Sequence, residues 1–204
     1  MHLEILNDKQ KKILPWLKEF SSSFGLVGGT ALALQIGHRQ SIDFDLFSNK
    51  PFNNLNLLGK ILKHKKITKT LIDHDGELTV VIEGVKITFL YYPFPILFDF
   101  VLLQNVKALG VKELAATKAY TVGRRGTYKD YADLYFIISE KHSTLDEIME
   151  MAEKKYAEFN SRLFLEQLIY LDDIYDTNII FLKNTLTKEQ IKAFFIDEIG
   201  KIKL

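Results

Sequence analysis

The stretch from residue 26 to residue 47 constrains the fold of this sequence more than any other part of it. It begins with two apolar residues that are typical of a short buried strand, and Gly28-Gly29 and the helix formers of residues 30–36 follow. We expect Thr30 to cap this helix, because a threonine hydroxyl accepts a hydrogen bond from the first helical turn. A strand, a glycine turn and a helix in this order predict an α/β sheet.

The second half of this stretch, residues 42–47, has the alternation of a strand. The predicted apolar face carries Ile42, Phe44 and Leu46. The opposite face carries Asp43 and Asp45. Because side chains two apart on a strand project to the same side, roughly 6–7 Å from each other, both carboxylates are expected to point to one place.

Two carboxylates beside a glycine turn favour a divalent cation and a phosphate ligand. Mg²⁺, or Mn²⁺ in its place, prefers a few carboxylate oxygens together with substrate phosphates. Glycines let the backbone approach a ligand, and the first turn of the following helix offers N–H groups to an anion. Each motif alone is more often a plain turn or a solvated strand face, but their combination predicts a functional site. The metal ligands are expected to be Asp43 and Asp45, and the phosphate ligands Gly28, Gly29 and Thr30.

The remaining patterns divide the chain into an α/β half and a helical half. Pro15 is expected to kink or split a helix over residues 8–22, and a helix near 57–62 precedes strands near 67–73, 77–83 and 85–91. We predict an α/β (α+β) fold, with a mixed sheet and flanking helices in a domain of residues 1–97 and a C-terminal helical bundle in a domain of residues 98–204. From about Asp99 onward, the helices are expected at 111–122, 130–139, 144–157, 161–171 and 187–198, with loops at 123–128 and 176–178.

The composition narrows the chemistry and the compartment. The 27 basic and 26 acidic side chains nearly cancel, so any nucleic-acid contact has to come from local patches. The absence of cysteine excludes disulfides and thiolate chemistry, and the five scattered histidines lack the spacing of a zinc site. Because there is no signal-peptide pattern and no window reaches the ~20 apolar residues of a membrane span, we expect a cytoplasmic protein without a membrane partner.

Several basic residues in the second half are further candidates for binding phosphate. Lys118 is expected in the middle of a helix among small residues, where its ammonium could meet a triphosphate, although an exposed helix lysine explains it equally well. Arg124, Arg125 and Lys129 share a loop that contains glycine, and this basic patch could hold the backbone of an RNA or could be an ordinary exposed loop.

Three other polar residues have both a functional and a local interpretation. Arg39 and Ser41 precede the aspartate strand and could face the phosphate or sugar of a nucleotide, whereas an arginine at a helix end is the ordinary alternative. Asp130 stands at the start of a helix, where an N-cap role explains it on local grounds.

Four blocks of the sequence resemble one known family. The order and spacing of LVGGTALAL (26–34), RQSIDFDLF (39–47), ELAATKAY (113–120) and RRGTYKDYADLY (124–135) are similar to those of the AbiEii/AbiGii nucleotidyltransferase toxins, a divergent branch of the DNA polymerase β nucleotidyltransferase superfamily. The resemblance implies a nucleotidyltransferase-like sheet and transfer of a nucleotide from a nucleoside triphosphate, in several members onto the 3′ end of tRNA. It also implies a toxin of a toxin–antitoxin or phage-defence pair, with essential residues at Lys118 and Asp130.

One departure from the superfamily pattern concerns the metal site. The superfamily usually has a third carboxylate on a later strand of the sheet, where this sequence has Lys86 and Thr88. Either the second metal position is reduced, or Asp130 or Glu83 supplies an oxygen from elsewhere, or the protein holds one ion tightly. The sequence leaves these three possibilities open.

The leading hypothesis is a magnesium-dependent nucleotidyltransferase that moves a nucleoside monophosphate from a nucleoside triphosphate to an acceptor hydroxyl, with the tRNA 3′ end as the expected acceptor and a cognate antitoxin as a partner. In this reaction Lys118 neutralises the charge that develops as the acceptor attacks the α-phosphorus and pyrophosphate leaves. The alternatives are the same fold acting on a protein or on a small molecule such as an aminoglycoside, and a noncatalytic module that binds nucleotide without turnover.

Overall fold

The chain folds into two compact units. A computed structural model describes residues 1–175 and 178–202, and it describes Arg125 without its side chain. The first unit contains the sheet, the second is built from helices, and the chain passes between the two units three times. The first unit consists of Met1–Pro95 and Asp99–Gly110, and the second of Ile96–Phe98 and the residues from Val111 onward.

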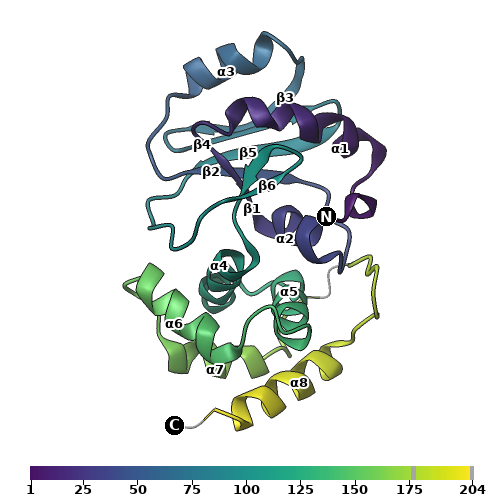
Figure 1. Cartoon of the computed structure of the whole chain (residues 1–204), viewed down its shortest axis with the longest axis vertical. Helices are drawn as coiled ribbons and strands as arrows, with labels where there is room; N and C mark the ends of the chain where they lie inside the picture. Colours follow the sequence, from purple (N-terminus) through teal and green to yellow (C-terminus); the bar gives the residue numbers. More distant parts are fainter. Residues whose placement is uncertain (176–177, 203–204) are drawn as a thin grey trace. The chain divides into compact units, whose positions relative to one another are not determined.

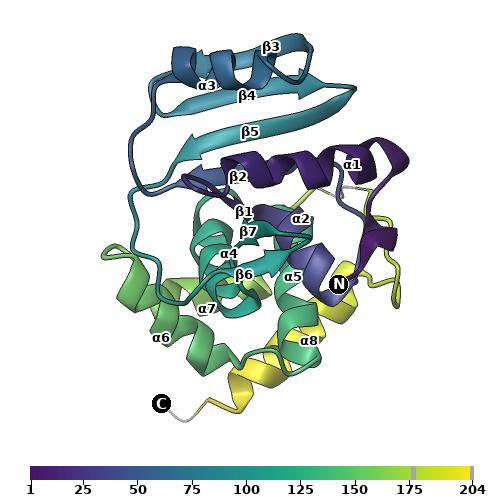
Figure 2. The same cartoon turned by 45° about the horizontal axis from the view of Figure 1, so that its top comes forward.

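A mixed sheet forms the centre of the first unit (Figure 1 and Figure 2). Within the described residues it has seven strands in the order β3-β4-β5-β2-β1-β7-β6. The pairs β2–β5 and β1–β7 are parallel and the other neighbours are antiparallel. Together with the C-terminal helices, this sheet confirms the predicted fold class. The strands are β1 Gly25–Val27, β2 Phe44–Ser48, β3 Ile67–His74, β4 Glu77–Ile82, β5 Val85–Tyr91, β6 Val101–Leu103 and β7 Val106–Ala108.

Short helices bury one face of this sheet. Phe20 and Phe24 pack edge-on against Phe89 of β5, with ring centroids 5.1 and 5.2 Å away. Pro15 stands at the start of a 3-10 helix that follows directly on α1, so the predicted split of this segment is confirmed. Figure 2 shows α3 lying along β3 at one edge of the sheet. The helical segments of this unit are η1 Leu3–Ile5, α1 Asp8–Ile13, η2 Leu14–Phe20, α2 Gly28–Ile36 and α3 Asn54–Leu62.

The hairpin β6–β7 is a correction, because helical structure was expected from about Asp99 onward. β7 joins the sheet beside β1, with Ala108 opposite Leu26. Gln104 and Asn105 connect the two strands with φ angles of 48° and 64°, and a two-residue turn of this kind requires two positive φ values. Strands of three residues are too short to show alternation, and Gln-Asn is not among the dipeptides that usually mark such a turn.

Five helices make up the described part of the second unit. The predicted loop over residues 123–128 exists but is shorter, with only Gly126 and Thr127 between the end of α4 at Arg125 and the start of α5 at Tyr128. Capping boxes that start at Thr144 and Thr187 fix the first turns of α6 and α8, close to the predicted starts. Of the predicted loop at 176–178, residues 176 and 177 lie outside the described residues. The helices are α4 Val111–Arg125, α5 Tyr128–Ser139, α6 Leu145–Lys155, α7 Ser161–Ile169 and α8 Lys188–Gly200.

A buried ion pair joins three segments of the second unit. Glu113 of α4 and Lys155 of α6 form it with both side chains fully buried. The second carboxylate oxygen of Glu113 accepts hydrogen bonds from the backbone N–H groups of Leu97 and Phe98, at 2.9 and 3.1 Å. Glu113 therefore attaches Ile96–Phe98 to the second unit, although the residues on both sides of this segment belong to the first.

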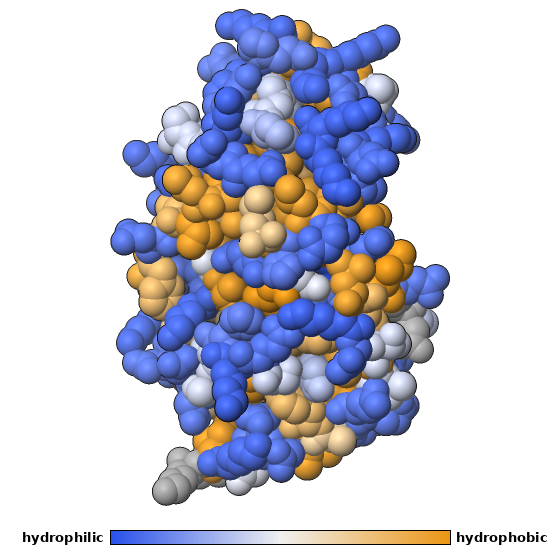
Figure 3. All heavy atoms as spheres, turned by 45° about the vertical axis from the view of Figure 1, so that its right-hand side comes forward, coloured by the Kyte–Doolittle hydropathy of each residue, from blue (hydrophilic) through white to orange (hydrophobic). Residues whose placement is uncertain are grey.

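The surface carries hydrophobic patches between hydrophilic areas. On the face drawn in Figure 3, hydrophilic side chains prevail at the upper end and hydrophobic side chains gather in patches below it. None of the helices in residues 1–175 and 178–202 combines the length and the apolar character that crossing a bilayer requires.

Candidate active site

The glycine turn lies directly against one of the predicted metal ligands. Gly28 has a φ of +70°, and a Cβ atom built on it would lie 2.7 Å from Oδ2 of Asp45. The antiparallel pairing of β1 with β2 causes this closeness, because it sets Val27 opposite Asp45. Only glycine combines this backbone conformation with so close a carboxylate, since it has no Cβ. The structure therefore brings together Gly28 and Asp45, two of the predicted site residues.

The structure corrects the role of Thr30. Helix α2 begins at Gly28, so Thr30 is its third residue rather than its cap, and no side chain caps the first turn. The Thr30 hydroxyl instead lies within hydrogen-bond distance of Ser41 Oγ, at 2.7 Å, and of the Asp43 carbonyl. Thr30 thus fixes the segment that leads into β2, and the first-turn N–H groups of α2 have the arrangement that binds anions.

Arg39 and Ser41 lie beside the same turn. A Cβ atom built on Gly29 would lie 2.5 Å from Nη2 of Arg39 and 3.5 Å from Oγ of Ser41. Arg39 is buried, and its Nη1 donates a hydrogen bond of 3.0 Å to the carbonyl of Gln40. A guanidinium next to the start of α2 adds positive charge where the helix already favours an anion.

The two aspartates do not share one regular strand. β2 begins at Phe44, so Asp43 directly precedes it, and Ile42 is 63% exposed instead of facing the core. The hydrogen-bonded ladder of β2 thus starts two residues later than the alternation suggested. Asp43 Oδ2 forms an ion pair of 2.7 Å with Nζ of Lys86 on β5, while Asp45 stands opposite Thr88 of the same strand.

The donor set suits one divalent cation. Among the described residues, no three or more His, Asp and Glu side chains gather as a metal site. Of the sequence alternatives for a third ligand, Glu83 pairs with Lys65 at 2.8 Å and Asp130 with Lys118 at 2.7 Å. Two carboxylates with substrate phosphates are a usual environment for Mg²⁺, so Asp43 and Asp45 fit this ion.

Lys118 is buried between two aspartates of α5, which corrects the alternative of an exposed helix lysine. Only 8% of Lys118 is exposed, and its Nζ lies 2.7 Å from Asp130 Oδ1 and 2.6 Å from Asp133 Oδ2. Asp133 was not among the predicted site residues. The signal in the sequence was the three-residue spacing of two aspartates on one helix, which places them on the same face.

Asp130 is ionised within this cluster. Burial raises the pKa of Asp130, but the Lys118 ammonium and the hydrogen bonds from Lys118 and Thr127 outweigh it, so the pKa is lowered from its ordinary value. Its Oδ2 accepts from the Thr127 hydroxyl at 2.6 Å and from the Thr127 backbone N–H at 3.3 Å. The carboxylate thus belongs to the capping of α5 and also fixes Lys118. Nearby, burial and Asp130 raise the pKa of Tyr131 to about 12.

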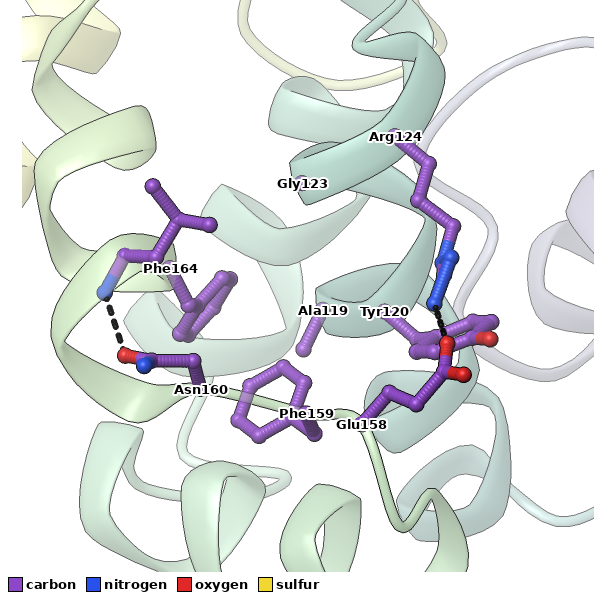
Figure 4. A pocket seen from close by; sticks show the side chains of 9 residues that line it. Ala119, Tyr120, Gly123, Arg124, Glu158, Phe159, Asn160 and Phe164 are labelled. Atoms are coloured by element: carbon purple, nitrogen blue, oxygen red, sulfur yellow. Dashed lines mark hydrogen bonds and ion pairs between the residues drawn. The ribbon is translucent and has the colours of Figure 1, made fainter.

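The predicted basic patch is only partly described. Arg124 reaches from α4 to Glu158, with Nη2 2.8 Å from Oε2, and its guanidinium lies 4.0 Å from the centre of the Tyr120 ring (Figure 4). These residues line a small pocket of about 160 Å³. Lys129 is half-buried on α5. The side chain of Arg125 lies outside the part of the chain that the structure describes.

Gly28→Ala is expected to lower the free energy of unfolding by about 1–3 kcal/mol, because it puts a Cβ at a positive φ and against a carboxylate. Urea denaturation followed by circular dichroism measures this change. Gly59→Ala is the matched control: Gly59 lies in α3 with no atom near its Cβ position, so the substitution should stabilise the protein by ~0.5–1 kcal/mol. Equal stability of the two variants would contradict the tight turn.

Two solved structures from Helicobacter pylori share the fold. The chain is similar to one described as a "putative nucleotidyltransferase", with a TM-score of 0.54 and 16% identity over 94% of this chain and 90% of that one. It is similar to JHP933 with a TM-score of 0.51 and 16% identity, over 78% of this chain and 87% of that one. At such identities the likeness concerns the fold alone.

Sequence comparisons identify the family of this chain. The chain is 31% identical over 162 residues to the uncharacterized protein aq_aa25 of Aquifex aeolicus (strain VF5), which covers 74% of this chain and 75% of that protein. Residues 77–202 match the family described as nucleotidyl transferase AbiEii toxin, type IV TA system. The matched range contains Lys118 and Asp130 but begins after the glycine turn and the aspartates. Because it spans more than half of the sequence, the chain belongs to the AbiEii nucleotidyl transferase toxin family of type IV toxin–antitoxin systems.

Proposed function

We propose that this nucleotidyltransferase uses Mg²⁺ to transfer a nucleoside monophosphate from a nucleoside triphosphate to the 3′-terminal hydroxyl of an RNA, with tRNA as the expected acceptor. The observation that carries the proposal is the contact between Gly28 and Asp45. It sets the anion-binding start of α2 against a carboxylate, as a metal–triphosphate complex requires.

The first unit binds the donor nucleotide in this proposal. Backbone N–H groups at Gly29 and Thr30 hold phosphate oxygens, and the charge of Arg39 supports them. Asp43 and Asp45 hold the Mg²⁺ ion, which when bound neutralises charge on the phosphates. The acceptor hydroxyl loses its proton to solvent, its oxygen forms a bond to the α-phosphorus, the bond from the α-phosphorus to the pyrophosphate oxygen breaks, and pyrophosphate leaves.

The family resemblance implies essential roles for Lys118 and Asp130, which belong to the second unit. Lys118 is held at 2.7 and 2.6 Å by two carboxylates, so its ammonium needs little reorganisation to act as a fixed positive charge. Asp133 is a positioning residue for Lys118, because it holds the ammonium from the next turn of α5. Asp130 supports the same ammonium and the start of α5.

The RNA acceptor and the antitoxin are the proposed macromolecular partners. Arg124, Arg125 and Lys129 are the proposed RNA contacts, because these cationic residues come from the end of α4 and the first turn of α5, and clustered cations suit a phosphate backbone. The chain's overall charge of +1 supplies no general attraction to RNA, so binding depends on this local patch. The antitoxin follows from membership in a type IV toxin–antitoxin family.

A labelling experiment tests the donor and the acceptor together. The purified chain is incubated with MgCl₂, total RNA and one α-labelled nucleoside triphosphate at a time, and the products are separated by size. We expect one nucleotide to label a band of tRNA length, with an equal amount of pyrophosphate released. Omitting MgCl₂ should abolish the label.

The other outcomes identify the alternatives. A labelled protein band or a labelled small molecule indicates the same reaction on another acceptor. Binding of the Mg²⁺–nucleotide complex without pyrophosphate release indicates a noncatalytic module. Labelling that continues unchanged in Asp45→Asn contradicts the assigned metal site, whichever acceptor is found.

A further inference from the structure

Lys86 stands beside a proposed metal ligand, on the strand where a third carboxylate was expected. β2 and β5 run parallel, with Asp45 opposite Thr88. The same register two residues earlier sets Asp43 opposite Lys86, and the ion pair of 2.7 Å between their side chains agrees with it. The charged side chain of β5 that lies beside the aspartates is therefore a cation.

No other strand in the described part of the chain places a carboxylate directly opposite the two aspartates, and the carboxylate of Glu77 on β4 is bound to Thr79, with Oε1 3.1 Å from Oγ1. On the β1 side Asp45 faces the backbone of Val27, and on the β4 side the partner of Thr88 is Thr79. Among the described residues no set of three metal-binding side chains exists. Asp43, Asp45 and Lys86 together thus carry a net charge of −1, which a single divalent cation already reverses.

We propose that Lys86 takes the place of a second metal ion, so that the site binds one divalent cation through Asp43 and Asp45 and uses the Lys86 ammonium as its other positive charge. This inference rests on the proposed function. The Lys86 ammonium, held 2.7 Å from Asp43, is a positive charge of the kind that stabilises a triphosphate as its negative charge shifts toward the leaving pyrophosphate.

The arrangement makes Lys86 act on metal binding and on catalysis in opposite directions. Its ammonium shares Asp43 with the incoming cation, so Lys86 weakens metal binding through competition and repulsion. The same charge supports transfer. An ion pair with a purely structural role would change neither metal binding nor nucleotide transfer. The side chains of this pair are 42% and 34% exposed, so the pair contributes little to folding stability.

Titration with Mn²⁺ alone, followed by electron paramagnetic resonance of the free ion, tests the inference on the full chain. Wild type is expected to bind one Mn²⁺. Lys86→Gln should bind it about tenfold more tightly, because one repelling charge near the ion is gone, while transfer falls at least about tenfold. Lys86→Glu should bind a second Mn²⁺, since it completes a set of three carboxylates.

Lys65→Gln is the matched control, because it removes the same charge from an ion pair with Glu83 in the same unit, and it should change neither measurement. Two Mn²⁺ ions on the wild type, or a Lys86→Gln affinity and transfer rate within about threefold of wild type, overturn the inference. Asp45→Asn separates this failure from that of the proposed function. If Asp45→Asn loses Mn²⁺ but Lys86→Gln is unchanged, only the role of Lys86 is wrong; if Asp45→Asn binds Mn²⁺ like wild type, the metal site itself is wrong.

Discussion

Asp45→Asn is expected to lower nucleotide transfer at least about 100-fold while the protein stays folded, because a metal ligand supports charge stabilisation worth several kcal/mol in the transition state. Asn has nearly the shape of Asp, so the close contact with Gly28 is kept and only the charge is lost. Release of pyrophosphate measures the rate, and circular dichroism confirms the fold.

Asp75→Asn controls for the loss of an acidic side chain from the same unit. Asp75 is exposed in the two-residue turn between β3 and β4, next to Gly76, and Asn-Gly suits such a turn as well as Asp-Gly. Its rate is expected to match that of wild type. Equal rates for wild type and Asp45→Asn would remove Asp45 from the site.

The same substitution has a second expected effect, on thermal stability. Without metal, Asp45→Asn should melt at or above the temperature of wild type, because it relieves repulsion between two carboxylates. Lys86 already neutralises part of that charge through Asp43, so the gain should be small. With Mg²⁺ and a nucleoside triphosphate the variant should gain less than wild type, since ligands stabilise the state that binds them. A large loss of stability without metal would instead mark Asp45 as a structural residue.

Lys118→Met is expected to lower the free energy of unfolding by about 3–5 kcal/mol, because it leaves two buried carboxylates without their shared cation. Urea denaturation at pH 7 measures this change. Lys154→Met is the matched control, since Lys154 forms an exposed pair with Glu150 on α6 and its loss should cost at most ~0.5 kcal/mol. A similar small effect for both variants would contradict the burial of Lys118.

The pH dependence of this difference follows from the lowered pKa of Asp130. A carboxyl whose folded pKa lies below its unfolded value stabilises the fold above the unfolded pKa, and this stabilisation is lost as the pH falls through the folded pKa. The gap between wild type and Lys118→Met should therefore be largest at neutral pH and should narrow below about pH 4. A gap that is constant from pH 7 to pH 3 would show that charge is not its cause.

Transfer by Lys118→Met is expected to fall at least about 100-fold, on the scale of one lost electrostatic contact to the transition state. Stability and activity are separated by the double variant Lys118→Met with Asp133→Asn. Asp133→Asn removes one of the two unpaired carboxylates, so the double variant should be more stable than Lys118→Met while its transfer rate stays low. Recovery of both together would make Lys118 a structural residue only.

The elements that were predicted well are those with a long local signal. β4 and β5 are six and seven residues long and rich in β-branched and aromatic residues, and both were predicted to within one residue. The glycine turn was recognisable because two glycines between an apolar strand and a helix have few other uses. The contact of Gly28 with Asp45 was expected only in general terms, since it depends on the pairing of β1 with β2.

The features that could not be predicted depend on contacts with residues far away in the sequence. β6 and β7 exist because β1 offers them an edge, which no pattern within residues 101–108 reveals. Thr30 has the residue type of a cap, but α2 begins two residues earlier, at Gly28, and the Thr30 hydroxyl contacts the segment of Ser41 and Asp43. The sequence left open whether Lys118 is exposed, because its two partners lie on another helix.

Glu113 has a consequence for how this chain can be divided. Because it binds the backbone of Leu97 and Phe98, a short inserted segment of the first half of the sequence is part of the helical unit. No single cut in the gene separates the two units. A fragment that starts at Val111 loses the amides that Glu113 binds, and one that ends at Pro95 loses β6 and β7 from its sheet. Any continuous piece of the sequence that contains all of one unit therefore also contains part of the other.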